Sequence, residues 1–270
     1  MHPQRKPELR NYLVFMNTKV KGYILGAVAA ATYGMNPLFT LPLYKEGMNP
    51  DSVLFFRYLF AIPILGIMLK ARGRSFSLKR KEILPLVILG WLVAISSLTL
   101  FQSYNYMEAG IASTILFVYP ILVALIMAVA FKEKITLQTV LCIFLALSGI
   151  GLLYKGGDGT TLSLVGVGLV MASALSYAIY IVGVNRPILK DVATLKVTFY
   201  VLLFGLSLFL VRVDFGQSLH VVDKWYLWGN LIALAIFPTA ISFLCTTQAV
   251  QYIGLSLIHI SEPTRPLYIS

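Results

Sequence analysis

Residues 83–103 read ILPLVILGWLVAISSLTLFQS and contain no Asp, Glu, Lys or Arg. A helix needs about 20 predominantly apolar residues to cross the hydrocarbon core of a bilayer, and this run has that length. Inside lipid, such a segment must pair its own backbone N–H and C=O groups, so we expect a helix and not an open strand. The run therefore predicts a membrane-spanning helix.

Seven further apolar runs have a comparable length. Short runs of strict alternation, which are typical of a membrane β-barrel, do not occur. Composition agrees, because 12% of the 270 residues are charged and 58% are hydrophobic, whereas soluble domains carry about 25% charged residues. We predict an all-α, polytopic transmembrane bundle with eight complete spans: Gly22–Tyr44, Ser52–Leu69, Ile83–Ser103, Ala109–Phe131, Leu137–Tyr154, Leu162–Val184, Val192–Val211 and Trp225–Ala249.

The net charge of +11 is distributed unevenly between these runs. The segment before the first run and every second gap after it contain 16 Lys and Arg residues, and the alternate gaps contain four. Because basic loops stay in the cytoplasm, we predict a multi-pass protein of the inner (plasma) membrane with a cytoplasmic N-terminus. A nucleic-acid-binding protein would gather basic residues on one face among aromatic side chains, so we expect no nucleic-acid partner.

Two parts of the chain resemble each other at an offset of 142–146 residues. A repeat unit of five spans is odd, so its two copies must cross the membrane in opposite directions, as in many secondary transporters. We predict two inverted five-helix repeats, the second of which lacks its last two spans. Polar and aromatic residues recur in the same order in both parts: Tyr33 with Tyr177, Tyr58 with Tyr200, Ser96 with Ser242, Gln102 with Gln248 and Tyr106 with Tyr252.

The stretch SYNYMEAGIASTILFVYPILVAL at residues 103–125 resembles EamA-type members of the drug/metabolite transporter superfamily. FKEKITLQ at 131–138, FFRY at 55–58 and ALSYAIY at 174–180 fit the same pattern, which covers residues 20–254. The resemblance implies ten helices, both termini in the cytoplasm and a central cavity between the repeats. It also implies export of a small metabolite or drug by alternating access.

The end of the sequence departs from this pattern. Residues 255–270 contain only a short apolar part, and Pro263 and Pro266 oppose a ninth helix. Residues 255–265 also resemble translated adapter sequence from sequencing libraries. We therefore divide the chain into a basic cytoplasmic leader (1–21), a first repeat (22–154), an incomplete second repeat (162–254) and a non-native tail (255–270). We expect a chain truncated in this way to be inactive or impaired as a transporter.

Polar side chains within the spans are the candidates for substrate binding. Asn36 precedes Pro37, which exposes a backbone carbonyl group, and the amide is available either for a substrate or for bridging helices. Tyr33 and Tyr177 are related by the repeat and either line the cavity or pack against neighbouring helices. Tyr119 precedes Pro120 and belongs either to the binding set or to a kink.

Arg57 is the one charged residue well inside a span. It lies about 8 Å deep at 1.5 Å per residue, so it either binds an anionic substrate or extends its side chain to the interface. Gln102 and Gln248 lie toward opposite ends of the membrane, and each either lines a vestibule or is a solvated helix end. The predicted substrate-binding set is Tyr33, Asn36, Arg57, Gln102, Tyr119, Tyr177 and Gln248.

The sequence offers no nucleophile–base pair, metal-ligand cluster or phosphate loop on which to build an enzyme. We therefore predict no catalytic residue, no metal and no cofactor. The expected partners are the lipid bilayer and a small-molecule substrate, with a homodimer left open. Two alternatives remain: a non-transporting scaffold or receptor, which a dry bundle would favour, and a lipid-modifying enzyme, which ionisable residues converging at one interface would favour.

Small residues at helical spacing predict where helices approach closely. Gly22 and Gly26, with the alanines that follow, form one such face in the first span. Gly168 and Ala172 form another in the sixth. In lipid, small residues let the backbones of neighbouring helices approach, so we interpret both faces as packing surfaces.

Overall fold

A computed structural model of the protein describes residues 5–132, 140–141, 144–145, 148, 163–190 and 192–253. This part of the chain is helical throughout its length apart from short connections, and it contains no strand. The all-α prediction is confirmed. The predicted span Leu137–Tyr154 lies largely outside the described residues, so seven spans and not eight are seen: Val20–Lys45, Pro50–Ala71, Arg80–Ser103, Ala109–Phe131, Leu164–Val184, Thr194–Arg212 and Trp225–Ala249.

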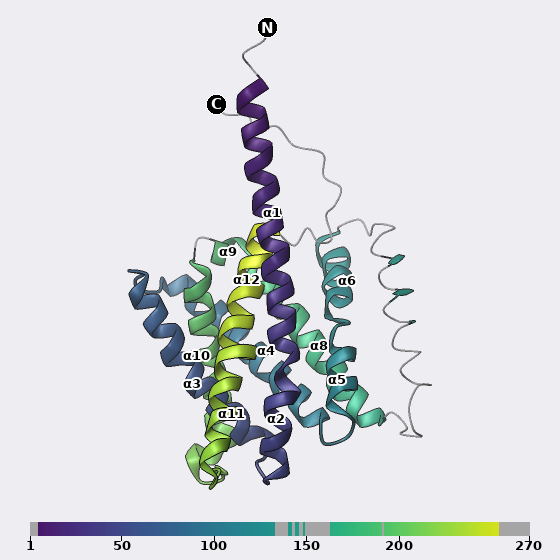
Figure 1. Cartoon of the computed structure of the whole chain (residues 1–270), viewed down its shortest axis with the longest axis vertical. Coiled ribbons are helices and arrows are strands. Elements are labelled where there is room, and N and C mark those ends of the chain that lie inside the picture. The colour runs from purple at the N-terminus through teal and green to yellow at the C-terminus, as the bar shows by residue number, and fades with distance from the viewer. Residues whose placement is uncertain are drawn as a thin grey trace.

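The helices follow one another with short turns between them (Figure 1). The first helix begins at Arg5 and continues without interruption through the segment that we predicted as a leader. It projects beyond the rest of the bundle (Figure 1). The elements are α1 (Arg5–Gly34), α2 (Asn36–Lys45), α3 (Pro50–Ala71), α4 (Arg80–Ser103), α5 (Ala109–Leu116), α6 (Tyr119–Phe131), α8 (Leu164–Val184), α9 (Pro187–Lys190), α10 (Thr194–Arg212), η1 (Asp214–Gly216), α11 (Trp225–Ala235), the π-helical turn η2 (Ile236–Ile241) and α12 (Ser242–Ile253).

Helices that correspond in the two repeats run in opposite directions (Figure 1). Helix α1 runs down from the N-terminus and α8 runs up; α3 runs up and α10 runs down; α4 runs down, and α11 with α12 runs up. This arrangement agrees with the predicted inverted repeats. We call the end that holds the N-terminus, the 72–79 loop and α9 the basic end, and the end that holds residues 46–49, 104–108 and 213–224 the opposite end.

Three spans are interrupted near their middle, each beside a proline. Proline has no backbone N–H and clashes with the carbonyl group four residues earlier, so the regular helical hydrogen bond cannot form there. The kink predicted at Pro120 is confirmed, and the first and last predicted spans are also present, each with an interruption. The breaks lie at Met35, at Phe117 and Val118, and at Ile236–Ile241, beside Pro37, Pro120 and Pro238 respectively.

Neighbouring side chains satisfy the carbonyl groups that two of these prolines leave free. Pro37 cannot donate to the Tyr33 carbonyl group, and Asn36 Nδ2 donates to it instead at 2.8 Å. Pro238 likewise cannot donate to the Leu234 carbonyl group, and Thr239 Oγ1 donates to it at 2.7 Å. Both breaks are therefore defined structures with their polar groups largely paired, as a membrane interior requires.

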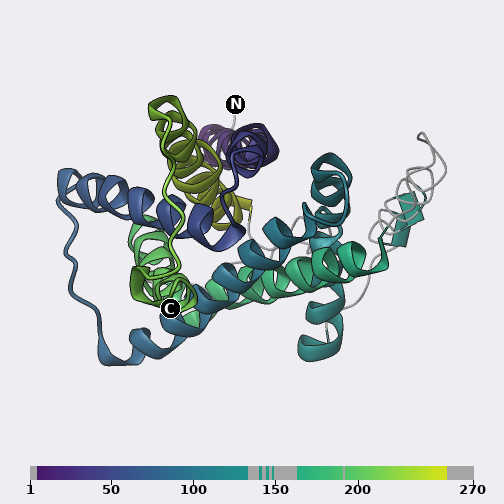
Figure 2. The ribbon, with the colours of Figure 1, turned by 90° about the horizontal axis from the view of Figure 1, so that it is seen from below.

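Helix α4 of the first repeat packs against α8 and α10 of the second repeat, and Figure 2 shows α4 lying along α8. The α4–α10 contact depends on two glycines. A Cβ atom added at Gly90 would lie 2.7 Å from the Val201 carbonyl oxygen, and one added at Gly205 would lie 2.9 Å from the Gly90 carbonyl oxygen. The backbones of α4 and α10 therefore touch, with no room for a side chain at this crossing.

Candidate functional site

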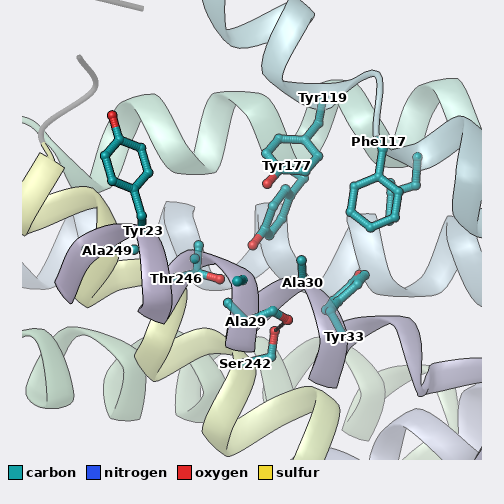
Figure 3. A pocket seen from close by; sticks show the side chains of 14 residues that line it. Tyr23, Ala29, Ala30, Tyr33, Phe117, Tyr119, Tyr177, Ser242, Thr246 and Ala249 are labelled. Carbon is teal, nitrogen blue, oxygen red and sulfur yellow. Dashed lines mark hydrogen bonds between the residues drawn. The ribbon is translucent and has the colours of Figure 1, made fainter. Parts of the chain in front are cut away.

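A cavity of about 320 Å³ lies where α1, α5 and α6 of the first repeat meet α8 and α12 of the second (Figure 3). Its volume falls within the range of about 300–1,000 Å³ that is typical of small-molecule sites. The lining runs from Gly22 and Ala249, near the basic end, to Tyr33 and Ser242 beside the helix breaks. A dry bundle, which a scaffold protein would have, is therefore not what the structure contains.

The wall that α1 contributes contains Tyr23, Tyr33 and a row of small residues: Gly22, Gly26, Ala27, Ala29 and Ala30. We predicted this face as a helix-packing surface, and at Gly26 it does approach α12, because a Cβ atom added there would lie 4.0 Å from the Ala249 Cβ atom. Ser242 Oγ also donates to the Ala29 carbonyl oxygen at 3.0 Å. The small side chains thus both permit this contact and leave the hollow beside it.

The other wall is aromatic, and Tyr177 of α8 is at its centre. The Tyr177 ring lies 4.9 Å from the Tyr119 ring, edge to face, and 6.3 Å from the Tyr33 ring, stacked, between ring centroids. Figure 3 shows Tyr119 and Tyr177 on one side of the cavity and Tyr33 on the other. The repeat-related tyrosines therefore face each other, as predicted. Such ring pairs contribute about 0.5–1.5 kcal/mol beyond the area that they bury.

Arg57 of α3 is fully buried, with 0% of its surface exposed. Its Nε atom donates to Thr239 Oγ1 at 2.5 Å, and its Nη2 atom donates to the Pro238 carbonyl oxygen at 3.2 Å. The guanidinium also lies 5.3 Å from the centroid of the Phe101 ring. The alternative that Arg57 extends to the membrane interface is therefore wrong, because the broken last span holds the guanidinium inside the bundle.

The predicted binding residues fall into three groups. Tyr33, Tyr119 and Tyr177 line the cavity. Asn36 and Arg57 are buried beside the helix breaks and do not line it. Gln102 and Gln248 are partly exposed near the opposite end and the basic end respectively, away from the cavity lining.

Sequence reasoning missed four polar or aromatic lining residues, Tyr23, Phe117, Ser242 and Thr246. Ser242 and Thr246 are one helical turn apart on α12 and face the cavity together (Figure 3). The correspondence of Ser242 with Ser96 in the repeat was the one signal that marked Ser242. Phe117 was not detectable from its residue type, because an aromatic residue in a membrane span usually packs against lipid or neighbouring helices.

Among the residues that the structure describes, no charged side chain lines the cavity, and its polar groups are the hydroxyls of Ser242, Thr246 and the tyrosines. Such groups can donate and accept hydrogen bonds, and the rings can stack on a flat or apolar ligand. Within the described residues, no group of three or more His, Cys, Asp or Glu side chains converges as a metal site requires. The arrangement is suited to holding a small molecule reversibly.

Two ion pairs connect the repeats at the opposite end. Asp51 accepts from Arg212 at 2.5 and 3.2 Å through its two carboxylate oxygens. Glu46 accepts from Lys224 Nζ at 2.6 Å, and this hydrogen bond to a carboxylate raises the pKa of Lys224 above its usual value of 10.5. Each pair joins a first-repeat carboxylate to a second-repeat cation.

Contacts between the repeats at the basic end use backbone acceptors and a ring. Lys196 Nζ donates to the Ser77 carbonyl oxygen, and the Tyr200 hydroxyl donates to the Phe76 carbonyl oxygen. The Arg186 guanidinium lies 3.5 Å from the centroid of the Phe131 ring. Among the described residues, both ion pairs between side chains thus lie at the opposite end.

Residues 20–155 and 164–270 each match the EamA-like transporter family, so the match contains two repeats. The chain belongs to the EamA-like transporter family. This family is part of the drug/metabolite transporter superfamily, and the sequence resemblance stated above is confirmed.

Several relatives carry the name of a transporter. The Uncharacterized transporter YyaM of Bacillus subtilis is 25% identical over 227 residues, which are 81% of this chain and 74% of that protein. An Uncharacterized transporter of Archaeoglobus fulgidus is 28% identical over 232 residues (84% and 79%). The Uncharacterized inner membrane transporter YicL of Salmonella typhimurium is 24% identical over 265 residues (94% and 88%).

A solved crystal structure has the same fold, with a TM-score of 0.64 and 18% identity over 90% of each chain. Membership of the EamA family and the apolar spans together place the protein in a lipid bilayer as a multi-pass transporter.

Proposed function

We propose that this EamA-family protein exports a small metabolite or drug across the plasma membrane by alternating access between its two repeats. The observation that carries the proposal is the cavity, because residues of both repeats line it. Tyr33 and Tyr119 come from the first repeat, and Tyr177, Ser242 and Thr246 come from the second. A rocking motion of one repeat against the other would therefore change the shape of this site, as alternating access requires.

The direction of transport follows from the orientation that we propose. Basic loops remain in the cytoplasm, so the basic end faces the cytoplasm. The cavity lies in the half of the bundle nearer to this end, since Gly22 and Ala249 are among its lining residues. The ion pairs Asp51–Arg212 and Glu46–Lys224 hold the repeats together at the opposite end. A site that loads from the cytoplasm and is closed toward the exterior supports export.

Transport is testable with the purified chain in proteoliposomes. We expect slow transport, in line with the impaired activity predicted from the sequence: a panel of small organic solutes, loaded on one side, should include at least one whose flux depends on the protein. Replacing Tyr177 by Leu should reduce that flux, because the ring at the centre of the aromatic wall is lost. Replacing Tyr252, whose side chain is exposed, by Leu is the matched control and should leave the flux unchanged. Correctly folded protein that moves no solute would contradict the proposal.

A further inference from the structure

We propose that Arg57 binds the negatively charged group of the substrate, so that the substrates of this carrier are small organic anions. The inference rests on the proposed transport function and adds the chemical class of the substrate. Arg57 does not line the cavity in the present structure. We infer its role from its charge, from its hydrogen-bond donor that lacks a partner, and from the contacts that link it to the cavity wall.

Arg57 is a cation inside the membrane, and no carboxylate of the described residues forms an ion pair with it. Neither ion pair in the part of the chain that the structure describes involves Arg57. Its guanidinium contacts a hydroxyl group, a carbonyl group and an aromatic ring, all of which are neutral. Neutral groups can share its hydrogen bonds but cannot neutralise its charge. Because a buried charge is costly unless it is paired, an anion from outside the chain is the partner that this site favours.

Unsatisfied polar atoms lie on the helices around the break in the last span. Arg57 Nη1, Asn36 Oδ1 and Thr40 Oγ1 are buried and have no hydrogen-bond partner among the described residues. Asn36 and Thr40 are on α2, which packs against α11 and contacts η2 through the rings of Phe39 and Phe237. Arg57 contacts η2 directly. Since buried polar atoms are nearly always paired, the free Arg57 Nη1 donor and the free Thr40 hydroxyl indicate a polar ligand. The free atom of Asn36 is an oxygen that can only accept a hydrogen bond, so Asn36 does not contribute to binding an anion.

Tyr33 connects this region to the cavity. Its side chain lines the cavity, and its carbonyl oxygen accepts the hydrogen bond from Asn36. Ser242, which also lines the cavity, directly follows the η2 turn that Arg57 contacts. A molecule in the cavity is therefore separated from Arg57 by the Tyr33 side chain and the adjoining helix break, which are parts that would move as the repeats rock.

The cavity selects the rest of the ligand. Its walls are aromatic or small and apolar, and its volume of about 320 Å³ suits a small molecule. An apolar or aromatic body would lie against Tyr119 and Tyr177, and the acidic group would point to Arg57. A guanidinium presents paired donors to a carboxylate or a phosphate equally well, so both are included in the class.

The test measures the melting temperature of the detergent-purified full chain with four matched probes. Benzoate and phenyl phosphate are anions, benzyl alcohol is neutral and benzylamine is a cation, all built on one aromatic ring. At about ten times its dissociation constant, a probe that binds should raise the melting temperature by about 3–6 °C. We expect this rise with at least one anion and not with the alcohol or the amine.

Variants then show whether Arg57 is responsible. Arg57→Gln should abolish the rise, and Arg57→Lys should keep a weaker one, because the charge remains but the paired donors are lost. Arg212→Gln removes an arginine at the opposite end and should keep the full rise. If Arg57→Gln does not fold, Arg57→Lys carries the test: a lower affinity for the anion supports the proposal, and an unchanged affinity overturns it.

Equal rises with all four probes, or none with either anion, would overturn the assignment of Arg57. Proteoliposomes separate this failure from failure of the proposed function. Flux of benzyl alcohol or benzylamine without flux of either anion overturns the substrate class and leaves the transport function standing. An anion-dependent rise that requires Arg57, without flux of any solute, supports the binding site and contradicts the transport function.

Discussion

Two of the surfaces along which the repeats meet differ in how closely their helices approach. At the α4–α10 surface, an added Cβ atom at Gly90 would lie 2.7 Å from a backbone oxygen of the other repeat. At the α1–α12 surface, an added Cβ atom at Gly26 would lie 4.0 Å from the nearest atom, and the cavity opens beside it. Small residues therefore either bring two helices into contact or leave a hollow, depending on what the facing helix presents.

The largest effect is expected where the backbones touch. Gly90→Ala would force the α4 and α10 backbones apart, and overpacking of this kind costs about 1–3 kcal/mol. Gly168→Ala is the matched control, since nothing lies within 4 Å of a Cβ atom added there. Thermal unfolding in detergent should show a lower melting temperature for the Gly90 variant alone. Equal melting temperatures would mean that the two surfaces do not differ as described.

The next effect concerns the hollow surface. Tyr177→Leu removes the ring pairs with Tyr33 and Tyr119, together with those to Tyr180 and Phe243. We expect a loss of about 1–2 kcal/mol, because the leucine still packs in place of the ring. Binding or flux of a solute should fall more than stability does, because Tyr177 lines the cavity. Parallel measurement of unfolding and flux checks this. A loss of stability with full flux would assign Tyr177 to packing alone.

A smaller effect is expected where α4 meets α8 through two serines. Ser173 Oγ donates to the Ser96 carbonyl oxygen at 2.7 Å, and the two hydroxyl oxygens lie 3.0 Å apart. Hydrogen bonds between membrane helices contribute about 0.6 kcal/mol on average. A double-mutant cycle with Ser96→Ala and Ser173→Ala should give a coupling of that size. A coupling of zero would mean that the contact between the two hydroxyl groups contributes nothing, and that packing and the hydrogen bond to the Ser96 carbonyl oxygen hold the helices together.

The smallest effect is expected at the exposed Glu46–Lys224 pair, and it depends on pH. Because the folded chain raises the pKa of Lys224 above 10.5, the pair stabilises the fold at neutral pH. That stabilisation is lost as the pH rises through the raised pKa. The difference in melting temperature between wild type and Glu46→Gln should therefore be constant near neutral pH and vanish in strong alkali. A difference that persists in strong alkali would have to arise from another contact of Glu46.

The sequence was sufficient for the parts of the fold that depend on the length of the apolar runs, on hydropathy and on the odd number of spans in the repeat unit. Seven spans were located by apolar length, and an odd repeat unit required the inverted orientation that α1 and α8 display. The same relation placed Tyr33 opposite Tyr177, because related positions in inverted repeats meet near the middle of the membrane. These inferences needed no knowledge of which helices are neighbours.

The remaining features depend on lateral neighbours, which hydropathy does not reveal. Depth alone left two directions open for Arg57, and its hydrogen bonds to Thr239 and to the Pro238 carbonyl group on another helix decide between them. The predicted packing motif at Gly168 faces open space, whereas the close crossing uses Gly90 and Gly205, which have no glycine at motif spacing. A glycine in a span is informative only once the facing surface is known.

The π-helical turn at Ile236–Ile241 contains one residue more than a regular helical turn. The extra residue rotates every later side chain of α12 around the helix axis. One residue corresponds to a rotation of about 100° around a helix axis. Deleting one residue from this turn would restore regular winding while swinging Ser242 and Thr246 around the helix and out of the cavity wall. The polar side of the cavity is thus set by the length of a single turn, independently of which side chains that turn carries.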